Sequence, residues 1–332
     1  MLERNNNSVV TVVEESNILS VLDDLGVHYV QKGQYAHLVD HDSLSITLNG
    51  KYKDHWMRWS TGDNGRGAKE LIQYLIQIGT VDHRRLKDVN IQGVKNIKVK
   101  KTPPFNYETM VTNPEPVRVR YFLTEQRKLS PPVVDRMISL GKIVQDGRDN
   151  VRFLWEFGEG NFTGADIQGT KFDKSIERGY LKHAASGSKG LFFVKDNQLK
   201  NVKDAKNVYI FEAPIDLLSY LEMAVYSEDR RLDIPEVLPT LEKDWVAFSL
   251  SGAGSKIMSA LQVIQEGFGM NLIEVKFYTA TDNDDAGQEV YNRLLAEGYD
   301  VKNVVPNRGL PHLANDGKPI KDWNDLLKIV KS

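Results

Sequence analysis

The sequence predicts an α/β protein whose C-terminal part, residues 204–332, holds a mostly parallel sheet flanked by helices. Two observations support this fold class. Short apolar runs alternate with segments of helical periodicity, and the runs are continuous, as expected for strands covered on both faces. The runs lie at 208–212, 245–250, 275–282 and 301–305, and the helical segments at 215–226, 256–266, 285–297 and 322–330.

The first 80 residues predict a small α+β domain. Apolar residues at helical spacing from Ser16 to Leu25 indicate a helix. The glycine-rich sequence at 62–67 predicts a turn into a second helix at 68–78. No Lys-Ser or Lys-Thr follows these glycines, so we interpret them as a helix entry and not as a phosphate-binding loop. Alternating stretches predict a small antiparallel sheet from residues 35–39, 44–48 and 56–59.

The lysines and prolines of residues 81–116 indicate a basic linker. The apolar pattern of residues 117–203 indicates a second α+β region. Residues 117–125 fit a helix or a strand, and Ser130-Pro131-Pro132 predicts the start of a helix. From residue 84 to residue 148 there are 14 Lys and Arg against 6 Asp and Glu, although the net charge of the chain is −2. Strands are expected at 151–157, 165–170 and 191–194.

Composition excludes several classes of protein. The 332 residues include no cysteine, which excludes disulfides, Cys-ligated zinc, iron–sulfur clusters and thiol catalysis. No apolar run approaches the roughly 18 residues that span a membrane, and the first residues do not have the pattern of a signal peptide. We therefore expect a soluble, cytoplasmic protein without a membrane partner.

Carboxylates gather at the predicted carboxyl ends of two strands. Glu212 ends the run at 208–212, and Asp282 and Asp284 end the run at 275–282. Ligands of open α/β sheets bind at this edge. Clustered carboxylates raise one another's pKa unless a cation compensates, and ligands that offer only oxygen suit Mg²⁺ or Mn²⁺. Further acidic residues nearby in sequence are Asp216, Asp285, Asp322 and Asp325.

Two other interpretations of the segment 281–287 were weighed. Asp and Asn are common helix N-caps, so the segment could be only a strand-to-helix turn. A calcium-binding EF-hand is excluded, because its twelfth position would be Arg293 where the loop requires Glu. The presence of Glu212 at a corresponding strand end favours a metal site.

These motifs resemble the Toprim domain of DnaG-type primases, topoisomerases and some nucleases. The resemblance rests on the strand that ends in Glu212, on the sequence DNDDAG at 282–287, on the small-residue turn within 248–254 and on the acidic motif at 321–325. One departure is Ala213, where the family usually has Gly. The resemblance is closest to a branch of primases carried by plasmids and conjugative elements.

The resemblance implies a role for each acidic residue. Glu212, Asp282 and Asp284 would be catalytic, Asp216 and Asp325 would support them, and the metal ligands would be Glu212, Asp282, Asp284, Asp285 and Asp322. Residues 117–203 resemble the basic subdomain that holds template and nucleotide in such primases. The implied contacts are Lys171, Lys182, Ser186, Ser188, Lys189, Arg118, Arg120, Arg127 and Lys128.

Residues 1–80 resemble a primase zinc-ribbon domain that has lost its ligands. Without cysteine, zinc cannot be held in the usual way, and the histidines do not form an alternative set, so we expect no zinc. Trp56 and Trp59 could stack on single-stranded bases, but aromatic residues at this spacing are more often part of a core.

The sequence thus predicts a DNA-dependent, Mg²⁺- or Mn²⁺-dependent primase that joins NTPs or dNTPs on single-stranded DNA. A separate helicase or relaxase is an expected partner, because no Walker A motif is present. One alternative is a Toprim nuclease, since strand cleavage uses the same acidic cluster. Another is a DNA-binding adaptor without catalysis. A topoisomerase is less favoured because no domain with a nucleophilic Tyr is evident.

Overall fold

The computed structural model consists of two compact units. One comprises residues 1–59 and 63–101, and the other residues 60–62 and 102–332. The fold is described here for residues 18–41, 44–58, 63–81, 103–176, 179–226, 239–252, 256–306 and 320–331. Among them, no helix is both long and apolar enough to cross a membrane.

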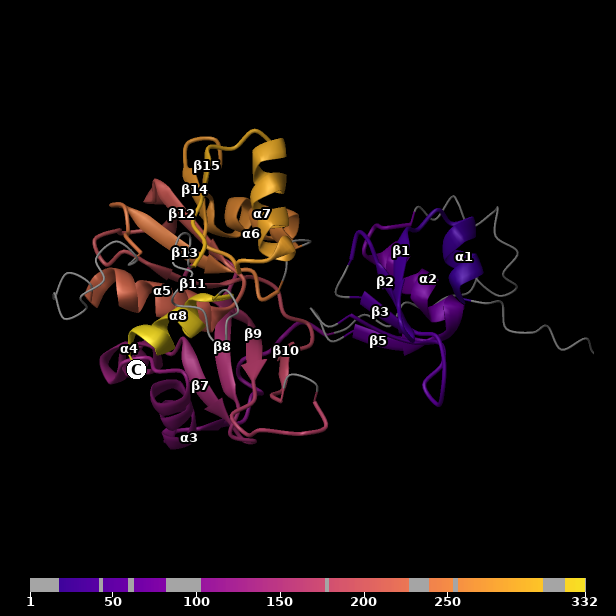
Figure 1. The fold of residues 1–332 in the computed structure, drawn as a ribbon, viewed down its shortest axis with the longest axis horizontal. Coiled ribbons are helices and arrows are strands. Elements are labelled where there is room, and N and C mark those ends of the chain that lie inside the picture. Colours follow the sequence, from indigo (N-terminus) through magenta and orange to yellow (C-terminus); the bar gives the residue numbers. More distant parts are fainter. Residues whose placement is uncertain are drawn as a thin grey trace, which may run out of the picture. The chain divides into compact units, whose positions relative to one another are not determined.

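The N-terminal unit is one antiparallel sheet with two helices on one face (Figure 1). Helix α1 covers Ile18–Asp24 and α2 covers Gly67–Gln77. Inward residues of the sheet, among them Leu38, Ile46 and Trp56, pack with both helices in one core. The sheet order is β1-β2-β3-β4-β5, with β1 at Tyr29–Lys32, β2 at Tyr35–Leu38, β3 at Leu44–Thr47, β4 at His55–Arg58 and β5 at Asp63–Arg66.

Two strands of this unit were not expected from the sequence. The prediction of a turn at 62–67 is wrong for Asp63–Arg66, which pair with β4 as strand β5. Gly65 lies against Trp56, and a Cβ there would come within 2.6 Å of the indole. Strand β1 shows no apolar alternation, because three of its four residues are exposed. Tertiary pairing, not local propensity, forms both strands.

The larger unit begins with an antiparallel sheet in the order β10-β9-β8-β7-β6. Residues 117–125 are helical, with α3 at Val117–Tyr121 continuing as a π-helical turn, η3, at Phe122–Gln126. Helix α4 covers Pro131–Ser139 and starts with proline, as predicted. The strands are β6 at Thr112–Asn113, β7 at Ile143–Asp146, β8 at Val151–Glu156, β9 at Phe162–Gln168 and β10 at Lys182–Ala184.

The mostly parallel sheet that the sequence predicts is confirmed, with one antiparallel edge strand. Its order is β11-β13-β12-β14-β15, and β11 pairs antiparallel with β13. The strands are β11 at Phe192–Lys195, β12 at Asn207–Phe211, β13 at Trp245–Ser249, β14 at Lys276–Thr279 and β15 at Val301–Asn303. A short 3₁₀ turn, η4, at Val202–Asp204 precedes β12.

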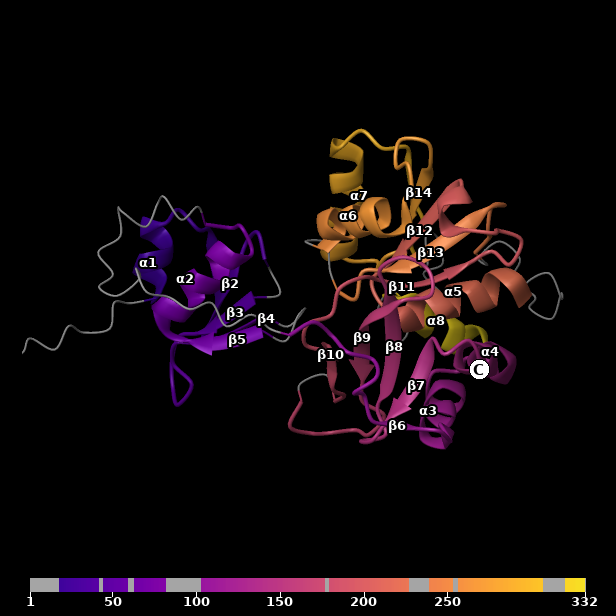
Figure 2. The same ribbon diagram turned by 180° about the vertical axis from the view of Figure 1, so that it is seen from behind.

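Helices cover both faces of this sheet, as Figures 1 and 2 show. Tyr209 and Phe211 of β12 pack with α5 and α8, whereas Val208 and Ile210 pack with α6 and α7. This alternation is the period of two of a strand that is buried on both sides. The helices are α5 at Pro214–Tyr226, α6 at Ile257–Phe268, α7 at Asp285–Ala296 and α8 at Trp323–Val330.

Candidate active site

Glu212 lies at the carboxyl edge of the parallel sheet. It follows β12 directly, and β12 is paired in parallel with β14, so the segment that carries Asp282 leaves the sheet beside it. The Asp282 backbone N–H donates to the Glu212 carboxylate. The other oxygen, Oε1, is buried and has no hydrogen-bond partner. Burial, together with Asp282 and Asp284, raises the pKa of Glu212 to about 7.

Asp284 uses its two carboxylate oxygens differently. Oδ1 accepts the Gly287 N–H at 3.0 Å and caps α7, so the segment does form the helix cap that was weighed against a metal site. Oδ2 lies 3.0 Å from the Lys321 Nζ. Burial raises the pKa of Asp284, but the Gly287 N–H and Lys321 outweigh it and hold the pKa below its ordinary value. The cap interpretation and the metal interpretation are therefore compatible.

The glycine of the DNDDAG motif has a steric reason. A Cβ at Gly287 would lie 2.0 Å from the Asp282 carbonyl oxygen, so no larger residue fits between α7 and the loop. The position of Ala213 does not require glycine for its backbone conformation, because its φ is not positive. The departure from Gly at this position therefore costs no backbone strain.

Asp216 and Asp322 lie on the other side of the site, where α5 and α8 begin. Asp216 is buried, and its Oδ1 accepts the Asn324 backbone N–H at 3.1 Å. Asp322 caps α8 by accepting the Asp325 N–H at 2.7 Å. Burial and Asp322 raise the pKa of Asp216, and burial and Asp325 raise that of Asp322. Asp322 is also the second cause, after burial, that raises the pKa of Asp282 to about 6.

A pocket of about 170 Å³ joins the two halves of the larger unit beside these carboxylates. On the side of the parallel sheet it is lined by Asp216 and Asp322, at the starts of α5 and α8. On the side of the antiparallel sheet it is lined by Arg127, Tyr180 and Lys182. Cations and carboxylates thus face one cavity.

Two of the predicted metal ligands or supporting acids have other surroundings, although Asp325 lies close enough to Asp322 to raise its pKa. Asp285 is exposed in the first turn of α7. Asp325 pairs with Lys328 at 3.0 Å within α8. The structure therefore brings together five of the seven acidic residues that the sequence singled out, namely Glu212, Asp216, Asp282, Asp284 and Asp322.

The donor set was tested for a fit to a divalent cation. Among the described residues, no three His, Cys, Asp or Glu side chains already converge as metal ligands. The unpaired Glu212 Oε1 and the all-oxygen donor set nevertheless fit Mg²⁺ or Mn²⁺. Asp282 Oδ2 and Asp284 Oδ2 both lie within 3.4 Å of the Lys321 ammonium, so these two oxygens already face one cation.

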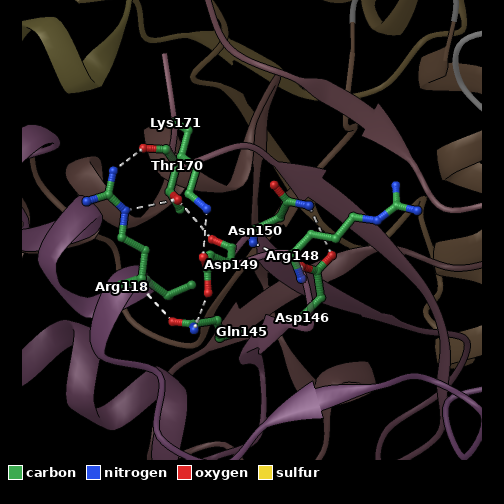
Figure 3. A network of polar contacts seen from close by, with 9 residues as sticks. Arg118, Gln145, Asp146, Arg148, Asp149, Asn150, Thr170 and Lys171 are labelled. Atoms are coloured by element: carbon green, nitrogen blue, oxygen red, sulfur yellow. Dashed lines mark hydrogen bonds and ion pairs between the residues drawn. The ribbon is translucent and has the colours of Figure 1, made fainter. Parts of the chain in front are cut away.

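Three of the seven predicted phosphate-binding cations already have partners inside the antiparallel part. Figure 3 shows Arg118, which donates to Thr170, and Lys171, which lies 2.8 Å from Asp149. Arg120 forms a bidentate pair with Asp135. Of the basic residues that the sequence named, Arg127 and Lys182 line the acidic pocket.

The remaining candidates lie elsewhere. The Lys128 carbonyl accepts the Lys331 ammonium, and the Ser188 hydroxyl accepts the Ala165 N–H. Lys189 lies over the Phe157 ring at 3.8 Å. Ser186 and Arg148 line a separate groove of about 850 Å³ on the antiparallel sheet. Arg148 contacts Asp146 through its backbone N–H, and its guanidinium points away from Asp146 in Figure 3.

Asp166 is a buried carboxylate whose role sequence analysis missed. Its Oδ2 accepts the Trp155 indole N–H at 3.0 Å and also the Ser251 hydroxyl. It therefore links β9 to the turn after β13, where the Gly252 N–H donates to the Glu212 carbonyl at 3.0 Å. Burial raises the pKa of Asp166. An Asp within a strand was the available signal, since charged residues are rarely buried unless paired.

Asp166→Ala is expected to lower the free energy of unfolding by about 2–4 kcal/mol, because it leaves the buried Trp155 and Ser251 donors unpaired. Asp166→Asn, which loses the same charge but keeps an acceptor oxygen, is expected to lose less than half as much. Urea unfolding of both variants and wild type measures the difference. Equal losses in the two variants would mean that the acceptor is not what matters.

Comparison with known proteins assigns two regions of the chain to sequence families. Residues 209–327 match the family model described as Toprim-like, so the C-terminal part of the chain is a Toprim-like domain. Residues 121–200 match a family of proteins of unknown function, DUF3991. Over 311 residues the chain is 28% identical to the plasmid protein pXO2-78 of Bacillus anthracis, itself uncharacterized, covering 90% of this chain and 82% of that one.

Solved structures with similarity to the chain include primases. The primase fragment of the bacteriophage T7 primase-helicase gives a TM-score of 0.39 at 14% identity, over 86% of this chain and 88% of that one. The Aquifex aeolicus primase, with its zinc-binding and RNA polymerase domains, gives 0.34 at 14% identity, over 95% and 80%. The RNA polymerase domain of Mycobacterium tuberculosis DnaG gives 0.35 at 12% identity, over 66% and 76%.

Proposed function

We propose that this protein is a metal-dependent, primase-like nucleotidyltransferase that makes short primers on single-stranded DNA. The observation that carries the proposal is the unpaired, buried Glu212 oxygen beside Asp282 and Asp284 at the strand ends of a Toprim-like domain. The similarity to a plasmid protein of Bacillus anthracis supports a role in the replication or transfer of a plasmid or other mobile element.

The proposed reaction forms one bond and breaks another at the α-phosphorus of an NTP or dNTP. The 3′-oxygen of the growing strand bonds to that phosphorus, the bond to pyrophosphate breaks, and the hydroxyl proton leaves. Mg²⁺ or Mn²⁺ bound by Glu212, Asp282 and Asp284 would lower the pKa of the hydroxyl and offset charge on pyrophosphate. Glu212, if not a ligand, would accept the proton of the hydroxyl as a general base.

Arg127 and Lys182 serve the nucleotide in this proposal. Both line the pocket that Asp216 and Asp322 also line, so their cations face the place where a triphosphate would lie. The Arg127 guanidinium lies over the Phe122 and Tyr180 rings, at 5.2 and 5.8 Å, which fixes its direction. A partner helicase or relaxase would supply the single-stranded template.

In this proposal the outer face of the N-terminal sheet binds the single-stranded template. Its positions alternate with those of the core, and this face includes Lys32, Tyr35, His37, His55 and Arg66 but no Asp or Glu. Tyr35 is 40% exposed. Exposed aromatic rings among cations suit stacked bases and phosphates.

Lys32→Ala combined with Tyr35→Ala is expected to weaken binding of oligo(dT) to the full chain by roughly tenfold at low salt, because a stacking ring and a phosphate partner are lost. Fluorescence anisotropy measures the affinity. Lys69→Ala, an exposed lysine on α2, is the charge control and should leave the affinity within about twofold. An equal loss in the control would exclude a specific role for this face.

The proposed activity is tested with circular and linear single-stranded DNA, labelled NTPs or dNTPs, and Mg²⁺ or Mn²⁺. Short labelled oligonucleotides that depend on template and metal would support primer synthesis. Loss of input DNA without synthesis would instead identify a Toprim nuclease, which uses the same carboxylates. DNA binding with neither reaction would identify an adaptor.

A further inference from the structure

Lys321 occupies the space between the two aspartates of the candidate metal site. Its Nζ lies 3.0 Å from Asp284 Oδ2 and 3.4 Å from Asp282 Oδ2. Its backbone carbonyl accepts the Asn283 N–H at 2.7 Å. The main chain of Lys321 is thus tied to the loop between the two aspartates, and its ammonium pairs with both carboxylates.

An ammonium and a divalent cation would use the same oxygens here. Asp284 Oδ1 already accepts a hydrogen bond from Gly287, so Oδ2 is the oxygen left to a cation, and Lys321 faces it. Two carboxylates that share one ammonium cannot direct the same lone pairs to a metal. Cation binding must therefore move Lys321.

The side chain of Lys321 is free to move. It is 58% exposed, whereas the Asp282 side chain is 14% exposed. A four-carbon stem on an anchored backbone lets the ammonium swing by several ångströms without a change in the fold. Lysine binds phosphate as a mobile point charge, so the displaced ammonium would find the phosphates of the nucleotide next to the metal.

We propose that Lys321 is the counter-ion of Asp282 and Asp284 until a divalent cation displaces it, and that its ammonium then binds the phosphates of the incoming nucleotide. The first half concerns metal binding alone, and the second half rests on the proposed function. The exchange keeps one positive charge between Asp282 and Asp284 before the cation arrives, and it supplies a positive charge when the nucleotide adds negative charge.

The test replaces Lys321 by Gln and titrates Mn²⁺ by calorimetry in the absence of DNA and nucleotide. Since the competing ammonium is gone, the variant is expected to bind Mn²⁺ roughly three- to thirtyfold more tightly than wild type. Lys206→Gln is the control for charge, because Lys206 precedes β12 and lies at the amino edge of the sheet, and it should not change the Mn²⁺ affinity. Thermal unfolding confirms that the variants are folded.

The second measurement is the KM for nucleotide in primer synthesis at saturating Mn²⁺. Loss of a phosphate contact is expected to raise the KM of Lys321→Gln roughly tenfold. The variant is therefore expected to bind Mn²⁺ more tightly and nucleotide more weakly. Replacement of a merely structural lysine would damage the loop and weaken the binding of both Mn²⁺ and nucleotide.

The outcomes separate this inference from the proposed function. Mn²⁺ affinity that is unchanged or weaker in Lys321→Gln overturns the counter-ion role, whatever the reaction is. Tighter Mn²⁺ binding with an unchanged nucleotide KM overturns the phosphate role alone. If wild-type protein binds no Mn²⁺, both this inference and the metal-dependent function are overturned. If it binds Mn²⁺ but makes no primers, the proposed function and the phosphate role of Lys321 are overturned, and the counter-ion role stands.

Discussion

Asp282→Asn is expected to lower primer synthesis by roughly 10²–10³-fold, the largest effect of any single change in this protein. Asp282 lies beside both Glu212 and Asp284, and its backbone N–H also orients Glu212. The amide keeps the size of the side chain and removes the charge that a divalent cation needs. The rate of incorporation of labelled nucleotide, measured over a range of Mg²⁺ concentrations, gives the size of the loss.

Asp300→Asn is the matched control for Asp282→Asn. Asp300 is an exposed carboxylate that precedes β15, so it lies at the opposite edge of the sheet from the candidate site. Its replacement is expected to leave the rate within about twofold, because a distant surface charge is screened by salt. Single-stranded DNA binding should be unchanged in both variants. Full activity of Asp282→Asn would remove the acidic cluster from the mechanism.

Trp323→Ala is expected to lower the free energy of unfolding by about 3–5 kcal/mol. Trp323 is the first residue of α8 and is buried; its ring packs edge-on against Tyr220 with 4.7 Å between centroids. Its indole N–H donates to the Ala280 carbonyl at 2.9 Å, so it fixes α8 to the loop that carries Asp282. Removal of the ring leaves a cavity between α5, α8 and β14. Denaturant unfolding followed by circular dichroism measures the loss.

Trp323→Phe separates packing from the hydrogen bond in this prediction. Phe keeps most of the contact with Tyr220 but leaves the Ala280 carbonyl without its donor, and a loss of about 1–2 kcal/mol is expected. If Trp323→Ala and Trp323→Phe were equally destabilising, the hydrogen bond and not the packing would hold α8. If neither changed the midpoint of unfolding, the contact between α8 and β14 would not contribute to stability.

The C-terminal fold could be predicted because its signals are local. A strand such as β12 is apolar and buried on both faces from Val208 to Phe211, whatever it pairs with. The N-terminal strand Asp63–Arg66 contains no apolar residue, and only its partner β4 makes it a strand. Strand β11 was predicted as a strand, but sequence alone could not show that it joins the parallel sheet across the boundary at residue 204.

The candidate site divides in the same way. The parallel pairing of β12 and β14 follows from the βα pattern, and it alone brings Glu212 next to Asp282. Asp285 and Asp325 share the sequence neighbourhood of the other acids, but Asp285 is exposed on α7, and Asp325, although next to Asp322, pairs with Lys328 within α8. The motif at 321–325 contains Lys321, but its pairing with Asp282 and Asp284 depends on side-chain direction, and the partner of Asp166, Ser251, is far away in sequence, so neither role could be predicted.

Strand β11 has a consequence for how such proteins can be assembled in evolution. It lies within the segment 121–200 that matches one family, yet it forms the edge of the sheet in the segment 209–327 that matches the other. The two segments also share one hydrophobic core, in which Phe153 and Phe192 pack with Tyr209 and Phe211. A recombination break between them would strip the Toprim-like sheet of an outer strand and expose its core. In this chain we therefore expect the two segments to be inherited together, whereas the N-terminal unit has a core of its own.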